Sequence, residues 1–322
     1  MTPKENLLAA IRHARPDYVP RGNEPVMAGI AYEGNFRVAN WTDAWGTRWE
    51  TTRDDMVPFP KGNPLPDLRR VGEYTPPDPH ALFDADESLG DRLAAIPDRE
   101  GKLVFGSQIY FVYERAWAVT GLDAFLAGFH EHPDELRELL RKIADYNIAV
   151  FERYIELGVD GVSFSEDLGS QRALMISPAH FREFIKPEYS RMFRVVKDAG
   201  CLINFHSCGC VEAIVEDLID VGVDILNPVQ SRANDLAKVK RIAYGRMALQ
   251  GAIDTHEVLM LGTPETVEDE VKRVFSILAP GGGYIAGPDQ GMPFPEENIA
   301  ALWNAAERWG AYGADGALRD LP

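Results

Sequence analysis

The segment Cys201–Cys210 reads CLINFHSCGC, and it joins a run of apolar residues to a cluster of metal-binding side chains. The apolar run and the helical pattern that begins near Val211 together predict a buried β-strand followed by a loop. On a strand, residues two positions apart point to the same face, so His206 and Cys208 should lie side by side at its carboxyl end. One imidazole and one thiolate supply half of a tetrahedral zinc site.

Each of these two residues also has a simpler interpretation. Cysteine is among the residues most often buried, and a single histidine is more often a core residue than a ligand. A disulfide between Cys208 and Cys210 is another alternative, although nothing in the sequence indicates an oxidising compartment. The occurrence of His206 and Cys208 together at a strand end, directly before Gly209, favours a metal site.

From Lys102 onward, short β-rich runs alternate with longer helical patterns. Strands are predicted at residues 103–107, 160–165, 201–206, 224–227, 247–252 and 283–286, and helices at 133–157, 178–199, 211–221, 236–242, 264–278 and 295–309. This alternation, with glycine at helix ends, predicts βα units and a parallel sheet. We therefore expect an α/β fold, a (β/α)8 TIM barrel that occupies residues 1–322 as one domain. An open doubly wound sheet is the alternative, and it is less favoured because no G-x-G-x-x-G turn follows any strand.

The region before Lys102 has a different character. Residues 2–14 are predicted to form a short amphipathic helix, whereas residues 15 to about 100 are rich in proline and show little periodicity. We expect irregular loops and short strands that cover one end of the barrel, and this region must also supply the remaining barrel strands. It contains a cluster of aromatic residues: Tyr32, Phe36, Trp41, Trp45 and Trp49. They form either a small core beneath the loops, which is the favoured interpretation, or the wall of a pocket for a flat apolar substrate.

Composition argues against several classes of function. The 322-residue chain has 45% hydrophobic residues, enough for a large core, and a formal net charge of −17. That charge argues against nucleic-acid binding, because phosphate contacts need clustered Lys and Arg. Residues 1–14 lack the continuous apolar core of a signal peptide, and no stretch approaches the ~20 apolar residues of a membrane span. Three cysteines do not make a disulfide framework, so we expect a cytoplasmic protein without a membrane partner.

Polar side chains follow the predicted strands at the edge of a parallel barrel where catalytic residues collect. In chain order they are Glu166 and Asp167, His206 and Cys208, Asn227 and Gln230, Asp254, and Asp289 and Gln290. Glu166, Asp254 or Asp289 could add an oxygen ligand to a metal held by the His-Cys pair. Cys210 is a further candidate, provided that the chain turns at Gly209. Three protein ligands with one open position are typical of a catalytic zinc site, whereas closed sites are structural.

Several segments of the chain resemble the uroporphyrinogen decarboxylase superfamily, and more specifically its methyltransferase branch. They are residues 165–169 (SEDLG), 176–178 (ISP) with 184–187 (FIKP), 205–209 (FHSCG), 222–230 (GVDILNPVQ), 251–254 (GAID), and 281–285 (GGGYI) with 295–299 (PEENI). The resemblance implies a TIM barrel and a zinc ion that activates a thiol methyl acceptor or assists methyl transfer between a substrate and a corrinoid on a partner protein. His206 and Cys208 fall on the His-x-Cys ligand pair of this branch. Glu166 falls where many members carry an acidic residue near the metal.

The chain departs from the family pattern in two places. Members of the methyltransferase branch often carry Cys or His in the segment that corresponds to residues 288–290, where this chain has Asp289 and Gln290. Either Asp289 or Glu166 then substitutes, or Cys210 has taken over, or the metal chemistry has changed. The arginine-rich motif by which true uroporphyrinogen decarboxylases bind propionate groups has no clear counterpart around residues 20–37. Decarboxylation of uroporphyrinogen is therefore disfavoured.

These observations lead to the hypothesis of a zinc-dependent methyltransferase of the demethylase type. It would move a methyl group between a small O-methyl or N-methyl substrate and a corrinoid (cobalamin) or thiol acceptor, with a corrinoid protein as its partner. The candidate metal ligands are His206, Cys208, Glu166 and Asp289, the candidate catalytic residues are Glu166, Asp167 and Asp254, and the candidate substrate-binding residues are Asn227, Gln230 and Trp45. A metal-independent decarboxylase or lyase, and a ligand-binding barrel without turnover, are the alternatives.

Overall fold

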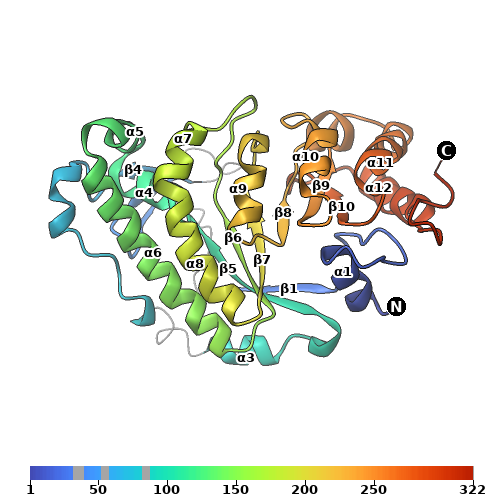
Figure 1. Ribbon diagram of the computed structural model, residues 1–322, viewed down its shortest axis with the longest axis horizontal. Coiled ribbons are helices and arrows are strands. Elements are labelled where there is room, and N and C mark those ends of the chain that lie inside the picture. The colour runs from blue at the N-terminus through green and yellow to red at the C-terminus, as the bar shows by residue number, and fades with distance from the viewer. Residues whose placement is uncertain (32–39, 52–57, 82–87, 322) are drawn as a thin grey trace.

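A parallel β-sheet forms the centre of the molecule. The computed structural model describes residues 1–31, 40–51, 58–81 and 88–321, so Tyr32 and Phe36 of the aromatic cluster lie outside the described residues. The sheet has seven strands in the order β1 (Met27–Ile30), β5 (Leu103–Ile109), β6 (Gly161–Ser165), β7 (Leu202–His206), β8 (Ile225–Asn227), β9 (Ala248–Ile253) and β10 (Tyr284–Pro288). All six of its neighbouring pairs are parallel, as the strand–helix alternation predicts (Figure 1).

The two edges of this sheet meet through the segment that leads into β1. The Gly22 amide donates to the Ala286 carbonyl on β10, and the Ala286 amide donates to the Pro20 carbonyl, both at 2.8 Å. A few residues later, β1 pairs with β5. One extended stretch thus bonds to β10 through Pro20 and Gly22 and to β5 through β1, and the sheet curls into a barrel. The prediction of an α/β barrel of the TIM type is confirmed, with seven strands of the main sheet among the described residues.

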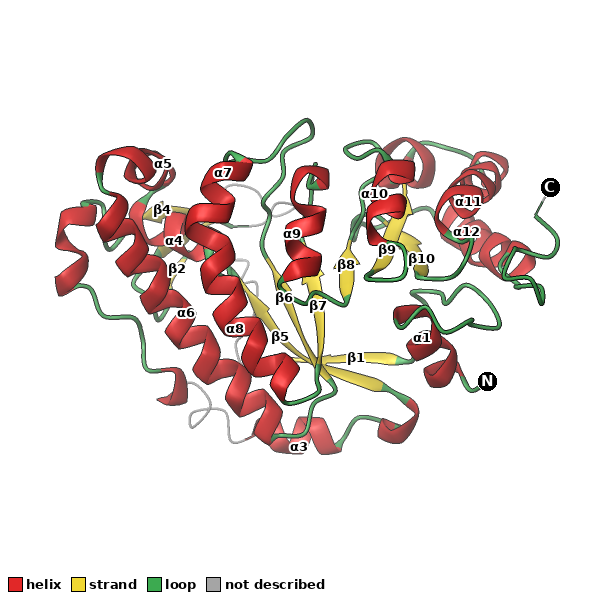
Figure 2. Ribbon diagram, viewed as in Figure 1, coloured by secondary structure: helices red, strands yellow, loops and turns green. Residues whose placement is uncertain are grey.

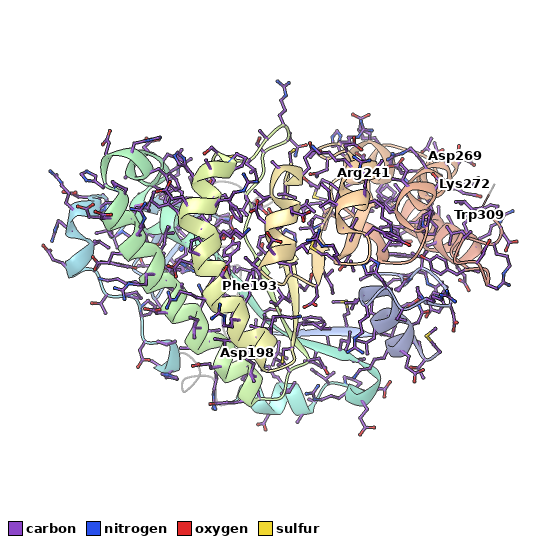
Figure 3. The ribbon with its side chains drawn as sticks, viewed as in Figure 1. Phe193, Asp198, Arg241, Asp269, Lys272 and Trp309 are labelled. Atoms are coloured by element: carbon purple, nitrogen blue, oxygen red, sulfur yellow. The ribbon has the colours of Figure 1, made fainter. Side chains whose placement is uncertain are left out.

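Helices cover the outside of the strands (Figure 2). They are α4 (Tyr113–Thr120), α5 (Leu122–Glu131), α6 (Pro133–Glu156), α7 (Pro178–His180), η3 (Phe181–Ile185), α8 (Lys186–Asp198), η4 (Glu212–Ile214), α9 (Val215–Asp220), α10 (Leu236–Ala243), η5 (Thr255–Met260), α11 (Pro264–Leu278) and α12 (Glu296–Trp309). The longer helices bury one apolar face: on α8, Phe193 is fully buried whereas Asp198 is exposed (Figure 3). The Lys272 ammonium lies 5.2 Å from the Trp309 ring and links α11 to α12.

Apolar side chains from the two faces of the strands form two separate cores. On the outer face, Phe164 and Phe205 lie in ring contact with each other at 5.1 Å and pack among aromatic side chains of the helix layer. On the inner face, Phe105 and its neighbours meet Leu7 and Ile11 of α1 (Pro3–Ile11), which closes the amino end of the barrel. Burial of one such side chain stabilises the fold by about 1.5–3 kcal/mol. The carboxyl end of the strands is left for chemistry.

The N-terminal region adds a small antiparallel sheet, which together with loops matches the expected irregular cover. Its strands are β2 (Trp41–Thr42), β3 (Arg48–Glu50) and β4 (Phe59–Gly62), and η1 (Leu68–Glu73), α3 (Ser88–Ala94) and η2 (Arg99–Gly101) follow before β5. Trp45 is 3% exposed and contacts the Tyr146 ring at 4.6 Å. The Arg115 guanidinium lies 4.8 Å from the Trp45 ring and pairs with Asp43 at 2.6 Å. Trp45 therefore belongs to a core beneath the loops, and its prediction as a substrate-binding residue does not fit this burial.

No helix in the described parts of the chain has both the length and the apolar character that a membrane span requires.

Candidate metal centre

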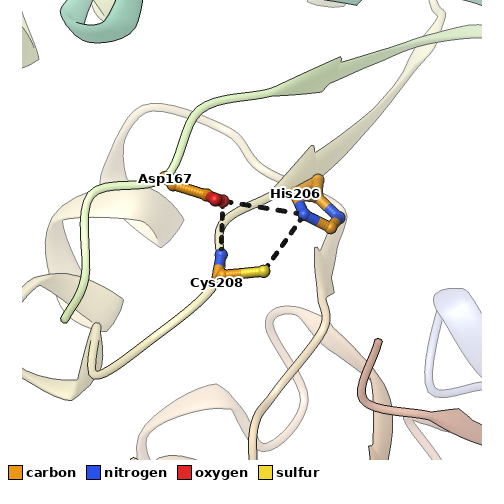
Figure 4. A group of neighbouring side chains, drawn as sticks. All are labelled: Asp167, His206 and Cys208. Atoms are coloured by element: carbon orange, nitrogen blue, oxygen red, sulfur yellow. Dashed lines mark hydrogen bonds and ion pairs between the residues drawn. The ribbon is translucent and has the colours of Figure 1, made fainter. Parts of the chain in front are cut away.

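Three side chains converge at the carboxyl ends of β6 and β7. Ser165 pairs with His206 in the register of the two strands, and Asp167 and Cys208 each follow two residues after that pair. Because alternate residues of a strand share a face, Asp167, His206 and Cys208 all project toward the same side. Figure 4 shows the three side chains pointing toward one another. Their ligand atoms lie within 4.8 Å of one another, and among the described residues no other group of three such side chains does so.

The distances between these ligand atoms suit a tetrahedral ion. His206 Nε2 lies 3.5 Å from Cys208 Sγ and 3.7 Å from Asp167 Oδ1. Zinc bonds of normal length and tetrahedral angle place nitrogen about 3.6 Å from sulfur and about 3.4 Å from oxygen. The two distances from His206 therefore match a tetrahedral ion, Cys208 Sγ and the Asp167 carboxylate lie within 4.8 Å of each other, and a fourth position remains for a further ligand. One nitrogen, one sulfur and one oxygen donor fit zinc.

Hydrogen bonds hold the three side chains in place. The Cys208 amide donates to Asp167 Oδ1 at 2.9 Å, so the loop after β7 orients the carboxylate. Gln290 Nε2 lies 3.3 Å from Cys208 Sγ and donates toward the sulfur. Asn227, at the end of β8, hydrogen-bonds the His206 ring. Such outer contacts fix the orientation of metal ligands and tune their basicity.

Burial and local charge set the protonation states of the His-Cys pair. Burial, helped by the Asp167 carboxylate, raises the pKa of the Cys208 thiol to about 12. Burial lowers the pKa of His206, so its imidazole is neutral at pH 7, which is the form that binds metals. A divalent cation would favour the Cys208 thiolate and release its proton. The site is therefore poised to exchange one proton for a cation.

The neighbouring carboxylate Glu166 faces the opposite way. It is fully buried, its carboxylate accepts a hydrogen bond from the Tyr189 hydroxyl on α8, and it accepts the Glu114 amide at 3.1 Å. The Val112 and Tyr113 amides also bond to it, so Glu166 supplies the N-terminal cap that α4 lacks in its own sequence. Burial raises its pKa to about 8. The predicted role of Glu166 as a metal ligand does not fit this orientation, because a strand places residues 166 and 167 on opposite faces.

Two other carboxylates that the sequence predicts for the site accept hydrogen bonds from backbone amides instead. Asp254 caps η5, accepting the Glu257 amide at 2.6 Å and the Val258 amide at 3.1 Å, and it also pairs with Arg232. Asp289 is 5% exposed and accepts the Thr255 amide at 3.1 Å. Neither carboxylate belongs to the convergent group. Asp289 as a ligand and Asp254 as a catalytic group are therefore not favoured by the geometry.

The loop that carries Cys208 turns sharply at Gly209, which has a φ of +83°. A side chain there would place its Cβ 2.2 Å from the Gly169 carbonyl oxygen, so only glycine fits. Gln230 accepts the Gly209 amide at 2.7 Å and fixes the turn. Although the chain does turn, Cys210 stays outside the convergent group, and its amide bonds to the Ser170 carbonyl. Gln230 thus positions a ligand loop, and Cys210 is not a ligand in this geometry.

A cavity of about 350 Å³ opens beside His206. Its described walls are His206, Asn227, Pro228, Pro288, Asp289, Gln290, Gly291, Met292 and Phe294. Asn227, which the sequence predicts to bind substrate, therefore lines this cavity. The sequence-based prediction did not include Met292 and Phe294. Both follow β10, so their position in the loop after a barrel strand was the signal that could have indicated them. For Gln290 the sequence indicated only a polar residue after a strand, and not its contact with Cys208.

The fold and the site define an α/β barrel with a candidate metal centre at its catalytic end, and comparisons with known proteins assign its family. The family model for uroporphyrinogen decarboxylase (URO-D) matches residues 116–309, more than half of the chain. The chain belongs to this family.

Individual relatives carry two activities. The methylcobamide:CoM methyltransferase MtaA of Methanosarcina barkeri is 25% identical over 69% of this chain and 60% of its own length. The uroporphyrinogen decarboxylase of Nocardia farcinica is 29% identical over 46% of this chain and 39% of its own length. The chain thus spans only part of the curated relatives it matches. A methyltransferase structure from Methanosarcina mazei superposes with a TM-score of 0.74 at 19% identity, covering 96% of this chain and 99% of that one, which supports the fold.

Proposed function

We propose that the protein is a zinc-dependent methyltransferase that moves a methyl group between a small O-methyl or N-methyl substrate and a corrinoid or thiol acceptor. The observation that carries this proposal is the convergence of Asp167, His206 and Cys208 at tetrahedral spacing beside an open cavity. Membership of the family and similarity to a methylcobamide:CoM methyltransferase support it. The relatives do not by themselves decide between methyl transfer and decarboxylation.

The residues of this chain would hold the metal and shape the space next to it. When bound by Asp167, His206 and Cys208, zinc supplies Lewis acidity that draws charge from the heteroatom of a thiol or of a methylated substrate. Gln290 steadies the Cys208 sulfur from one side, and Asn227 steadies the His206 ring from the other. The reacting heteroatom would therefore meet a centre whose orientation is fixed in advance.

The cavity walls would offer a substrate both apolar and hydrogen-bonding contacts. Pro228, Met292 and Phe294 give it an apolar side, and the amides of Asn227 and Gln290 give it hydrogen-bonding groups. A small methylated substrate or thiol suits about 350 Å³. We propose that the corrinoid is carried by a partner protein that docks over the same barrel mouth, because cobalt must come within reach of the methyl group.

The proposed thiolate ligand also indicates the cellular compartment of the protein. A thiolate ligand requires Cys208 to remain reduced, and all three cysteines of the chain are free. Free thiols are maintained in reducing compartments. We therefore propose a cytoplasmic location.

The decisive experiment measures methyl transfer in both directions with zinc-loaded protein. In one direction, methylcobalamin and 2-mercaptoethanol are incubated with the protein, and S-methyl product is detected by mass spectrometry. In the other, a panel of O-methyl and N-methyl compounds is incubated with cob(I)alamin, and the methylcobalamin spectrum is followed. We expect transfer with the wild type and with Cys210→Ser, and its loss with His206→Ala. Silence in both directions with folded, zinc-loaded protein would refute the proposal.

A further inference from the structure

The walls of the cavity beside the metal centre carry negative charge. Among the described residues that line it, Asp289 is the one carboxylate, and it is 5% exposed, so few water molecules screen it. Asp167 adds a second carboxylate in the metal centre, whose His206 lines the same cavity. Nearby Arg232 is already paired, through its bond to Asp254 and an ion pair with Glu257 at 3.5 Å. The described groups around the cavity therefore leave an excess of negative charge.

A count of formal charges shows what this means for a ligand. A divalent cation bound by the Asp167 carboxylate and the Cys208 thiolate has no net charge, since His206 is neutral. Asp289 then gives the surroundings one negative charge, and a substrate thiolate in the fourth position adds a second. An anionic group elsewhere on the same small molecule would share a cavity of about 350 Å³ with both. Because the Asp289 carboxylate is only 5% exposed and little screened by water, such like-charge contacts weaken binding.

The other residues of the cavity wall suit a hydroxyl or ammonium group. Gln290 Oε1 accepts the Gly291 amide at 3.0 Å and the Asn227 side chain bonds His206, but each amide oxygen has two lone pairs and can also accept from a hydroxyl or ammonium group. Phe294 offers an aromatic ring, and aromatic faces attract cations. Met292 adds a polarisable, apolar side chain that is 44% exposed at the edge of the cavity.

We propose that the small molecule bound in this cavity carries a neutral or positively charged tail, and that the cavity discriminates against anionic thiols. This inference rests on the proposed function, since it assumes a metal at the Asp167–His206–Cys208 centre. It adds the charge class of the substrate, which the family assignment leaves open.

The test compares three thiols of equal chain length: cysteamine, 2-mercaptoethanol and 2-mercaptoethanesulfonate. Protein loaded with Co²⁺ is titrated with each thiol at equal thiolate concentration, and binding is read from the visible spectrum of the metal, independently of activity. We expect cysteamine to bind at least about tenfold more tightly than the sulfonate, with 2-mercaptoethanol between them.

Charge variants at the cavity edge sharpen the test. Met292→Lys should improve sulfonate binding relative to cysteamine by about tenfold, and Met292→Glu should change the ratio in the opposite direction. Leu261→Lys adds the same charge at a position that is 68% exposed and outside the cavity walls, so it should leave the ratio unchanged. Because each thiol is compared between variant and wild type, differences in its intrinsic affinity for cobalt cancel.

The possible outcomes separate the two proposals. Sulfonate binding as tight as that of cysteamine in the wild type would overturn the charge inference, while methyl transfer measured separately could still stand. Failure of the protein to bind Co²⁺ would overturn the metal-dependent function, and the charge inference with it. Metal uptake without binding of any thiol would overturn the charge inference and leave the corrinoid-to-substrate direction to be decided by the methyl-transfer assay.

Discussion

The inner and outer faces of β6 and β7 carry ionisable side chains that are neighbours in sequence but have opposite roles. On the inner face, Asp167 joins His206 and Cys208 beside an open cavity. On the outer face, Glu166 is buried beneath α8, bonded to Tyr189 and to the first amides of α4. Both residues are carboxylates at a strand end, and only the two-residue period of the strand separates them. A carboxylate at the end of a barrel strand can therefore complete either a metal site or the hydrophobic framework, depending on which face of the strand carries it.

The largest expected effect tests this division of roles directly. Asp167→Asn should weaken zinc binding by about 100-fold or more, because removing a ligand should exceed the 10–100-fold losses known for outer-sphere contacts. Glu166→Gln, which makes the same chemical change one residue earlier, should leave zinc affinity within about threefold of the wild type. Competition with a chromophoric chelator measures both affinities.

The stability of the metal-free variant is the control for that experiment. The unfolding midpoint of the metal-free Asp167→Asn protein should match that of the metal-free wild type, since Asp167 is exposed and outside both cores. Equal losses of affinity in the two variants would break the comparison, because they would mean that both carboxylates reach the metal.

A second, smaller effect concerns how stability depends on pH. The pKa of Glu166 is about 8 in the folded protein, above its ordinary value of 4.5, because burial disfavours the charged form. Between these values the folded state holds a proton that the unfolded state has lost. The free energy of unfolding should therefore fall as pH rises from about 4.5 to 8, by on the order of a few kcal/mol from this group. Denaturant unfolding of the metal-free protein at pH 5, 6.5 and 8 measures this slope.

Substitution isolates the contribution of Glu166 to that slope. Glu166→Gln cannot ionise, so its stability should depend less on pH than that of the wild type. Glu297→Gln alters an exposed carboxylate on α12 and should keep the wild-type dependence. If Glu166→Gln and the wild type lost stability in parallel, the carboxylate would not be the group that titrates.

Much of the framework could be predicted from periodicity, because it depends on local patterns. The predicted strand 201–206 corresponds to β7, Leu202–His206, and the predicted helix 133–157 corresponds to α6, Pro133–Glu156. The closure of the barrel could not be predicted in this way. It depends on backbone bonds between Gly22 and Ala286, which lie far apart in sequence and involve no distinctive side chains.

The site was predictable only where its residues share one strand. His206 and Cys208 follow from the two-residue period alone, and the geometry brings them together. The oxygen ligand required the register between β6 and β7, which the sequence does not show, so Glu166 was assigned to the metal and Asp167 was not. Once the register pairs Ser165 with His206, the two-residue period of the strand selects Asp167. Trp45 illustrates another limit, because an aromatic residue in a loop region has the same sequence signal whether it lines a pocket or a core.

The smallest expected effect distinguishes the two cysteines on either side of Gly209. Cys208 contacts His206 at 3.5 Å, whereas Cys210 lies beyond the turn, where its backbone bonds to Ser170. Cys210→Ser should therefore change zinc affinity by less than about threefold, while Cys208→Ser, which removes a ligand, should weaken it by about 100-fold or more, as Asp167→Asn does. Zinc content after dialysis and chelator competition measure both variants under reducing conditions, so that neither thiol is lost to oxidation. A loss in Cys210→Ser comparable with that in Cys208→Ser would show that the Gly209 turn rearranges when the metal binds. The centre would then use two thiolates, and Asp167 would no longer be needed to complete its ligand set.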